Sequence, residues 1–332
     1  MTKTKIVLLQ NKSLTDTIFN KDDFDALSKL GELTFNQRST NPQPDEIKNL
    51  IKDADIVITS WGCPKIDKLI LNEASKLKLI VHAAGSVKGI VSDEVWNRNI
   101  RVTGCAEALG IGVAETALAL SISSVKNMWT LSKSTRNGEW NSGRENVREF
   151  YNLNIGVIGA GKAGRHYIKL LKNFEVKILL FDPTLDEAQC REMGVEKVSL
   201  EDLLKRSDVV SIHAPSIPAT DKMLNSTTLA LMKDNAVLIN TARGTIIDEN
   251  ALVAELEKGR LFACLDVTDP EPPVNDHPFR KLPNVVLLPH IAGAVNNGLH
   301  RIGKYAVCEI TKFLNNESLS GEVNLNNIDK LA

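Results

Sequence analysis

The sequence predicts an α/β protein built from two doubly wound parallel sheets. Short β-rich runs alternate with helical patterns in the first hundred residues, and a second alternation of the same kind starts near residue 154. Strands that alternate with helices favour parallel pairing, because each crossover helix returns the chain to the same edge of the sheet. The chain has 332 residues, which suits two domains of about 100–200 residues each.

The composition is that of an ordinary globular protein. Apolar residues make up 43% of the chain and charged residues 24%, which excludes disordered, collagen-like and coiled-coil proteins. Forty basic residues balance forty-one acidic ones without a block of like charge, so nothing points to nucleic acid. The longest apolar helical pattern, 106–122, carries Glu107 and Glu115 and is not expected to span a membrane. The apolar run at 6–9 is too short for a signal peptide, and we expect a cytoplasmic protein.

The cysteines are odd in number, scattered, and without the spacing of a metal site. We expect each to pack as a small hydrophobe, and we predict no metal and no disulfide. They are Cys63, Cys105, Cys190, Cys264 and Cys308.

Individual elements can be assigned in both halves of the chain. In the first half we expect strands at 6–9, 55–59 and 79–81 and helices at 22–30 and 45–52. One long helical pattern follows at 107–133, which suits a bridge between domains, part of a dimer face or an ordinary core helix. In the second half we expect strands at 154–158, 175–181, 208–212, 236–239 and 284–288, with helices at 162–171 and 249–258. Three prolines within 269–273 exclude regular structure there and predict a loop.

A glycine-rich turn occurs where a dinucleotide-binding domain requires one. Gly159-Ala160-Gly161-Lys162-Ala163-Gly164 follows the strand at 154–158 and opens the helix at 162–171. The first glycine allows the tight bend, the second lets the backbone approach a pyrophosphate, and the third lets helix and strand pack closely. The amides of Lys162 and Ala163 would face the diphosphate. The next strand ends at Asp182, which can bind the ribose hydroxyls and would repel a 2′-phosphate, so NAD is favoured over NADP.

Charged residues in the second half could support the reduction of a 2-oxo acid, which needs a cation, an acid and a group that keeps the acid protonated. Arg243 follows the strand at 236–239, at the sheet edge where ligands bind, and its guanidinium matches a carboxylate. His290 ends another strand, and Glu271 in the proline-rich loop could bind its ring. Taken singly, Arg243 could be a surface residue in a turn, and a lone histidine such as His290 is more often structural than catalytic. His213, followed by Pro215, also ends a strand and is a candidate to line the cofactor.

Several segments together resemble the D-isomer-specific 2-hydroxyacid dehydrogenase family. The resemblance extends from about residue 77 to 300. It rests on the segments 113–119 (VAETALA), 159–164 (GAGKAG), 240–244 (NTARG), 265–272 (LDVTDPEP) and 282–293 (LPNVVLLPHIAG).

The resemblance implies an NAD-dependent oxidoreductase that moves a hydride between the nicotinamide and C2 of a small D-2-hydroxy or 2-oxo acid. Arg243 would bind the carboxylate and carbonyl, His290 would donate the proton, and Glu271 would be its partner. Asp266 would contact the nicotinamide carboxamide. The cofactor site would also include Thr241, Ala242 and Gly293.

The resemblance also implies the domain organisation. A flavodoxin-like substrate domain, 1–106 with 297–332, would contain an inserted Rossmann NAD-binding domain, 107–296. The family is usually dimeric through the region around 107–133, so a homodimer is expected.

The chain departs from the family pattern at a few positions. The family usually has a glycine-hydrophobic-glycine turn followed by Asp, whereas this chain has Ala84-Gly85-Ser86-Val87-Lys88. The amides of Gly85 and Ser86 can still bind the substrate carboxylate, and Lys88 either reshapes the pocket or is a solvated residue. Ala163 replaces the usual Ile, which would loosen packing beneath the pyrophosphate. Trp61 is either a wall of the substrate pocket or a residue that caps the core.

Two alternatives use the same fold. A regulatory protein that senses NAD(H) would not need the complete set of Arg243, Glu271 and His290. The second alternative is a formate or phosphite dehydrogenase of this fold. Formate enzymes of this fold typically pair the histidine with Gln, because no proton has to be supplied, so Glu271 favours the 2-hydroxy acid.

Overall fold

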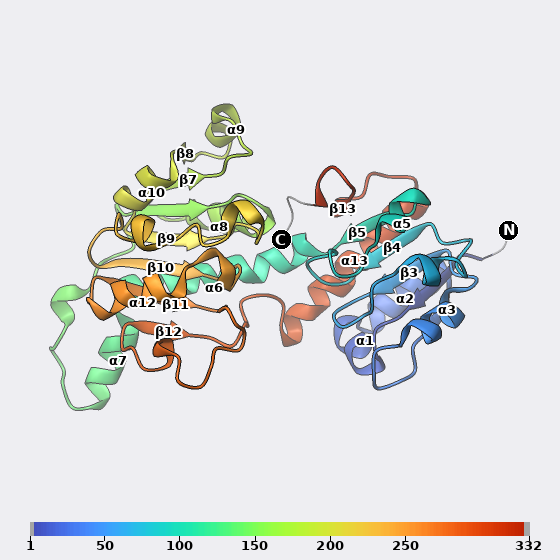
Figure 1. Ribbon diagram of the computed structural model, residues 1–332, viewed down its shortest axis with the longest axis horizontal. Helices are drawn as coiled ribbons and strands as arrows, with labels where there is room; N and C mark the ends of the chain where they lie inside the picture. The colour runs from blue at the N-terminus through green and yellow to red at the C-terminus, as the bar shows by residue number, and fades with distance from the viewer. Residues whose placement is uncertain (1–2, 329–332) are drawn as a thin grey trace. The chain divides into compact units, whose positions relative to one another are not determined.

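The computed structural model describes residues 3–328, which divide into two compact α/β units (Figure 1). The first unit comprises the chain up to Leu109 and the segment from Ala294 onward, and the second runs from Gly110 to Gly293. The first unit is therefore discontinuous in sequence. The predicted domain borders at 106/107 and 296/297 lie within a few residues of these positions.

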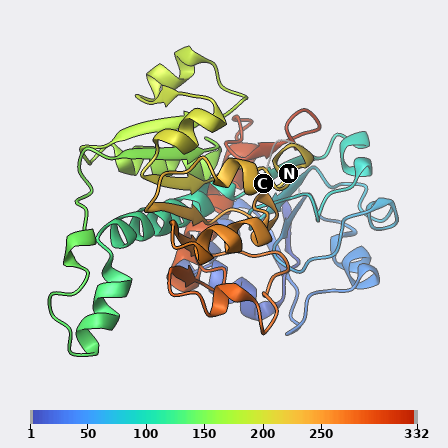
Figure 2. The ribbon, with the colours of Figure 1, turned by 60° about the vertical axis from the view of Figure 1, so that its left-hand side comes forward.

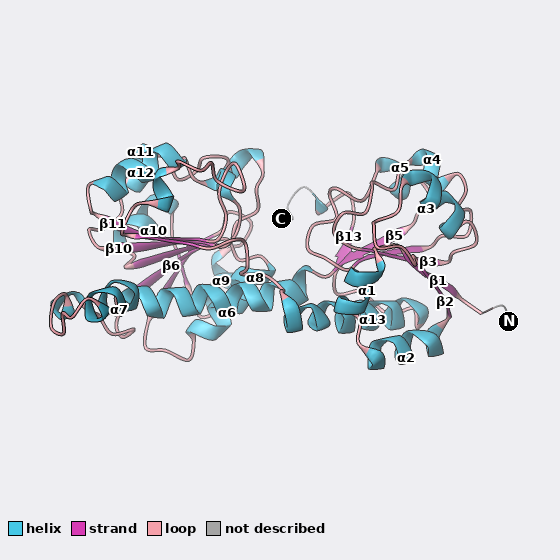
Figure 3. Cartoon of the chain, turned by 90° about the horizontal axis from the view of Figure 1, so that it is seen from below, coloured by secondary structure: helices cyan, strands magenta, loops and turns pink. Residues whose placement is uncertain are grey.

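The first unit has a flavodoxin-like sheet. Its strands lie in the order β13-β5-β4-β3-β1-β2, with β13 antiparallel to β5 and the other pairs parallel. The strands are β1 (Lys5–Leu8), β2 (Glu32–Phe35), β3 (Ile56–Thr59), β4 (Leu79–His82), β5 (Arg101–Gly104) and β13 (Glu322–Val323). Helices α1 (Lys12–Ile18), α2 (Lys21–Leu30) and α13 (Leu299–Leu314) cover one face, and α3 (Pro44–Ile51), α4 (Lys68–Leu71) and α5 (Asp93–Asn97) cover the other (Figure 3).

The second unit has a parallel sheet in the Rossmann order, extended by one strand. The order is β12-β11-β10-β9-β6-β7-β8. Its strands are β6 (Asn154–Ile158), β7 (Lys177–Phe181), β8 (Glu196–Lys197), β9 (Val209–Ile212), β10 (Ala236–Asn240), β11 (Leu261–Leu265) and β12 (Val285–Leu287). One face packs on α6 (Ala106–Val125), α8 (Lys162–Leu171) and α9 (Glu187–Glu192). The other packs on α10 (Leu200–Arg206), α11 (Ser226–Leu229) and α12 (Glu249–Glu257).

Helices on both faces explain why the central strands are continuous apolar runs. Every residue of β3, β4, β9 and β10 is buried, as expected for parallel strands covered on both sides. The edge strands differ, since β2 alternates exposed and half-buried residues and both residues of β8 are exposed. This lack of an apolar run is why the sequence did not predict β2 or β8.

The single helix predicted at 107–133 is wrong. The structure has α6, which ends at Val125, and α7 (Met128–Arg136). Asn127 separates them with φ +52°, a left-handed conformation that asparagine adopts more readily than most residues. No residue of α7 is buried, and Figures 1 and 2 show α7 and the loop after it extending away from the strands of their unit.

Of the described helices, α6 alone is long and apolar enough to cross a membrane by length and composition, with a mean hydropathy of 1.6. The helix instead packs on the sheet of the second unit, with Ala114, Ala117 and Leu120 in the core. At Gly110 an added Cβ would lie 2.9 Å from the amide nitrogen of Ala163, so α6 and the start of α8 approach closely. We therefore interpret α6 as a core helix.

Candidate active site

The glycine-rich turn between β6 and α8 is tightly packed at its first and last glycines and open at the middle one. Gly159 has φ +91°, and a Cβ added to it would lie 2.8 Å from the amide nitrogen of Ala214. A Cβ on Gly164 would lie 2.1 Å from the carbonyl oxygen of Gly159, whereas a Cβ on Gly161 would meet no atom within 4 Å. The space beside Gly161, at the N-terminus of α8, therefore suits the pyrophosphate of a dinucleotide.

Asp182 follows β7 and binds the glycine-rich turn. Its Oδ2 accepts a hydrogen bond of 2.8 Å from the amide of Ala160. Its Oδ1 accepts from the amide and the hydroxyl of Thr184, at 2.8 and 2.6 Å. A carboxylate is thus fixed beside the turn, where dinucleotide-binding domains hold the adenosine ribose.

His213 follows β9 and supports the turn from the protein interior. The side chain is buried, its Nε2 lies 2.9 Å from Ser211 Oγ, and its ring lies 5.0 Å from that of Tyr167. Burial lowers the pKa of His213 to about 3, so the ring is neutral at physiological pH. Its Nδ1 is buried without a hydrogen-bond partner among the described residues. Pro215, two residues on, is half-buried.

The turn after β10 is shaped by Asn240, which is fully buried. Its Oδ1 accepts from the amide of Ala242 at 3.0 Å, and its Nδ2 donates to the carbonyl of Arg243 at 2.9 Å. Arg243 is half-buried and donates one hydrogen bond, to the carbonyl of Ala242, so its other N–H groups have no partner among the described residues. The hydroxyl of Thr241 is buried and likewise lacks a partner in the described chain. Both groups can therefore bind a ligand.

Gly244 brings this turn against the proline-rich loop. A Cβ added there would lie 2.1 Å from the carbonyl carbon of Thr268 and 2.6 Å from the amide nitrogen of Asp269. No side chain fits in that space. The backbone after Arg243 and the backbone before Glu271 are consequently in direct contact.

Asp266 follows β11 and holds the turn that contains His290. Its two carboxylate oxygens accept hydrogen bonds from the amides of Ile291 and Ala292, each at 2.8 Å. Its carbonyl accepts from the amide of His290 at 3.0 Å. Asp266 is 1% exposed, and burial raises the pKa of its carboxyl.

Glu271 and His290 form a hydrogen-bonded pair. Glu271 Oε1 lies 2.5 Å from His290 Nδ1, and the two side chains are 41% and 48% exposed. The backbone of His290 has φ +52°, which is uncommon for a residue other than glycine. With Nδ1 bound to the carboxylate, Nε2 is available to exchange a proton with a ligand.

The pair lines a pocket of about 380 Å³ in the second unit. Asp266, Thr268 and Arg280 also line it, together with apolar residues of β12 and the segment after it. The predicted residues of this unit therefore gather at the carboxyl ends of β6, β7, β9, β10 and β11, the edge at which open α/β sheets bind ligands.

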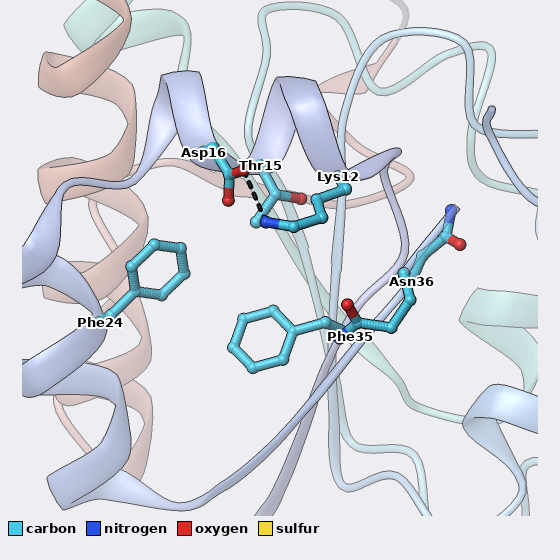
Figure 4. A pocket seen from close by; sticks show the side chains of 7 residues that line it. Lys12, Thr15, Asp16, Phe24, Phe35 and Asn36 are labelled. Atoms are coloured by element: carbon cyan, nitrogen blue, oxygen red, sulfur yellow. Dashed lines mark hydrogen bonds and ion pairs between the residues drawn. The ribbon is translucent and has the colours of Figure 1, made fainter. Parts of the chain in front are cut away.

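The predicted substrate residues follow β3 and β4 of the first unit. Trp61 is 40% exposed, and its carbonyl accepts a hydrogen bond of 3.1 Å from Asn41 Nδ2. Gly85, Ser86 and Lys88 are half-buried. A separate pocket of about 250 Å³ is lined by the Lys12–Asp16 ion pair and by Phe24 and Phe35 (Figure 4), and none of the predicted substrate residues lines it.

The described residues contain no group of three or more His, Cys, Asp or Glu side chains that could hold a metal. The five cysteines are free, and four of them are buried, with Cys308 exposed. Burial raises the pKa of Cys63 and Cys190, so these thiols stay protonated.

Comparison with known proteins identifies the family. Residues 118–292 match the D-isomer specific 2-hydroxyacid dehydrogenase, NAD binding domain. The chain belongs to this family. The protein is accordingly an NAD-dependent oxidoreductase that acts on a CH–OH group, and its second unit is the NAD-binding Rossmann domain.

Relatives of this dehydrogenase differ in their substrates. A D-3-phosphoglycerate dehydrogenase of Methanocaldococcus jannaschii is 33% identical over 96% of this chain, which spans 60% of that relative's length. A glyoxylate reductase of Thermococcus litoralis is 34% identical over 80% of this chain and 82% of its own. A phosphoglycerate oxidoreductase from Rhizobium etli has the same fold, with a TM-score of 0.83 over 97% of this chain and 99% of its own at 24% identity.

Some residues that shape the dehydrogenase site were missed in the sequence. Asn41 acts through a hydrogen bond to a loop that no sequence spacing reveals, and Asn240 lies in the segment 240–244 but was given no role of its own. Glu249 and Arg280 bind the proline-rich loop, and neither lies in a motif that predicts such a contact.

We expect this dehydrogenase to lose stability as the pH falls below about 6.5. Burial lowers the pKa of His82 to about 4, as it lowers that of His213 to about 3, so the unfolded chain binds protons that the folded chain does not. The stability present above the unfolded pKa is lost as the pH falls toward these folded values. At pH 5 each histidine contributes on the order of 2 kcal/mol to the loss.

Thermal unfolding at pH 7 and pH 5 measures this effect. His82→Gln should shrink the difference between the two pH values, and exposed His300→Gln serves as the control. An unchanged difference in His82→Gln would contradict the assignment.

Proposed function

We propose that the protein interconverts a small 2-oxo acid and the corresponding D-2-hydroxy acid. The observation that carries the proposal is the Glu271–His290 pair at 2.5 Å, at the sheet edge that also presents Arg243. Carbonyl reduction of this kind requires a cation, a proton donor and a group that keeps the donor protonated. These three residues meet the requirement.

Arg243 binds the substrate carboxylate and polarises the C2 carbonyl. Its guanidinium offers N–H donors in a fork that matches a carboxylate, and only one of them is used within the described chain. The buried amide of Asn240 fixes the turn on which Arg243 is placed. Binding and polarisation therefore come from one preorganised side chain.

His290 delivers the proton to the C2 oxygen through Nε2. The contact of Nδ1 with Glu271 orients the ring for this transfer. Bound NADH supplies the hydride that C2 receives. In the oxidative direction His290 is the base. Because a carboxylic partner serves proton transfer, the pair favours this reaction over formate oxidation.

The cofactor site follows from the turn and its neighbours. The open space beside Gly161 and the unpartnered hydroxyl of Thr241 fit a bound dinucleotide, and Asp182 places a carboxylate that disfavours a 2′-phosphate. We assign Asp266 to the nicotinamide carboxamide. The remaining cofactor residues are Gly159, Lys162, Ala163, Gly164, His213, Pro215, Ala242 and Gly293.

The substrate side is assigned to the first unit. The half-buried backbone at Gly85 and Ser86 offers amides for the carboxylate, and exposed Trp61 offers an apolar wall. Glyoxylate and phosphoglycerate, the substrates named for the relatives, bracket the size range that we propose. We also propose a homodimer, because Met128, Trp129 and Trp140 expose apolar surface on α7 and the loop after it. A cytoplasmic location stays a prediction from the sequence.

Oxidation of NADH with a panel of acids tests the reaction. Glyoxylate, hydroxypyruvate, phosphohydroxypyruvate, pyruvate and branched or aromatic 2-oxo acids are compared by nicotinamide absorbance. His290→Ala should lower kcat by about 10²–10⁴-fold, the range of general acid catalysis, while NADH still binds. NAD with formate is the parallel assay.

The outcomes separate the alternatives. Turnover with formate alone would replace the proposal with the formate reaction. NADH binding without turnover of any acid would favour an NAD(H)-sensing regulatory protein.

Gly161→Ala should weaken NADH binding without affecting the fold. The added methyl meets no protein atom within 4 Å but enters the space assigned to the pyrophosphate. We expect the dissociation constant for NADH to rise on the order of tenfold, a loss of about 1.4 kcal/mol, at an unchanged Tm. Gly89→Ala, where an added Cβ also meets nothing within 4 Å, is the matched control, and equal NADH affinity in both variants would refute the placement.

Lys88→Asp should change the order of preference among the acids. Lys88 is half-buried close to Gly85 and Ser86, so reversing its charge should disfavour substrates with a second anionic group, such as phosphohydroxypyruvate, more than glyoxylate. Steady-state kinetics across the panel measures this. An unchanged order would leave Lys88 as a solvated surface residue.

A further inference from the structure

The loop that carries Glu271 has few donors with which to hold itself in place. Pro270, Pro272 and Pro273 have no amide hydrogen, so most of the loop offers carbonyl acceptors only. Glu271 must nevertheless stay within hydrogen-bond distance of His290 for the pair to work. Donors from outside the loop are therefore required on at least one side of Glu271.

Arg280 supplies such donors on the C-terminal side. Its Nη2 donates to the carbonyl of Pro273 at 2.8 Å, and its Nε donates to the carbonyl of Val274 at 3.0 Å. The side chain thus binds two successive carbonyls with a rigid planar group that has donors and no acceptor. A shorter or apolar side chain could not make both contacts.

Glu249 holds the N-terminal side of the loop. Its Oε1 accepts a hydrogen bond of 2.8 Å from the amide of Asp269, and its Oε2 lies 3.1 Å from His277 Nε2. His277 Nδ1 accepts from the amide of Phe279 at 3.2 Å, which leaves Nε2 as the donor to Glu249. Phe279 is buried in the core, so this anchor is tied to the body of the unit.

Both anchors converge on one short segment. His277 is the N-cap of the 3-10 helix η4 (Pro278–Arg280), and Arg280 is its last residue. Arg280 also lines the same pocket as Glu271 and His290. The segment therefore binds the loop directly after Glu271 and, through Glu249, before it, and it does so beside the acid–base pair.

We propose that Arg280 is a positioning residue that keeps Glu271 on His290 by anchoring the carbonyls of Pro273 and Val274. Glu249 and His277 complete the anchor from the other side. The inference rests on the proposed function, since it concerns the same acid–base pair. It adds a residue outside the motifs that predict the site.

Arg280 could also affect His290 through its positive charge rather than by anchoring the loop, and the two roles have to be distinguished. Asp266, Glu271 and Arg280 are the charged groups that line the pocket with His290. Lys281, the next residue along the chain, is exposed and has the same charge. Lys281→Leu thus removes a nearby cation without removing a loop anchor.

Nitrogen-detected imidazole spectra of ¹⁵N-histidine protein test the proposal without substrate. At a pH where the ring is neutral, contact with Glu271 should favour the Nδ1–H tautomer of His290, whose signals are identified by their loss in His290→Gln. Glu271→Ala gives the reference for a ring without its partner. We expect Arg280→Leu to move the His290 signals at least halfway to that reference and Lys281→Leu to leave them unchanged. In the double variant with Glu271→Ala, Arg280→Leu should cause no further movement of the signals.

Turnover supplies a second readout. Arg280→Leu should lower kcat on the order of tenfold, part of the contribution of general acid catalysis, and this effect should vanish in the Glu271→Ala background. Wild-type signals in Arg280→Leu, or equal movement in Lys281→Leu, would overturn the proposal. Absence of turnover in the wild type would count against the proposed function instead, because the spectra are recorded without substrate.

Discussion

The carboxylate of Asp266 binds the turn that carries His290, and the candidate site is arranged around this contact. Both oxygens accept backbone amides at 2.8 Å from a position that is almost completely buried. Burying a carboxylate is costly, and the cost falls only when charge-assisted hydrogen bonds replace water. The amides of Ile291 and Ala292 provide that replacement. The same bonds fix the direction in which the chain leaves β12, and hence where the imidazole lies.

The hydrogen bonds of Asp266 also hold the backbone of His290 in a strained, left-handed conformation. A left-handed backbone at a non-glycine residue costs on the order of 1 kcal/mol and persists where its surroundings determine it. Here the backbone N–H groups of His290 and of the next residue, Ile291, both donate hydrogen bonds to Asp266, the first to its carbonyl and the second to its carboxylate. Gly244 contributes from the other side, because its missing side chain lets the Arg243 turn contact Thr268. The three proposed catalytic residues thus depend on backbone contacts between the ends of β10, β11 and β12.

Much of the fold was predictable because its signals are local. The strand at 154–158 and the helix at 162–171 were predicted with the boundaries that the structure shows, since an apolar run and a glycine-rich turn define both. Asn127 was not predicted to end α6, because an asparagine in a helical pattern does not reveal a left-handed backbone. The site motifs were found for the same local reason. Arg280 and Glu249 were not predicted because they bind backbone atoms of the loop, and no pattern of side chains in a sequence reveals such contacts.

Three histidines show why sequence position alone could not decide the chemistry. His82, His213 and His290 all lie at or just after the end of a parallel strand. His82 and His213 are 3% and 8% exposed, with pKa values lowered by burial, and both bind a hydroxyl rather than a carboxylate. The side chain of His290 is 48% exposed and bound to Glu271. Access to a ligand and an acidic partner distinguish a proton donor from a core residue, and both arise from a loop that folds back onto the strand end.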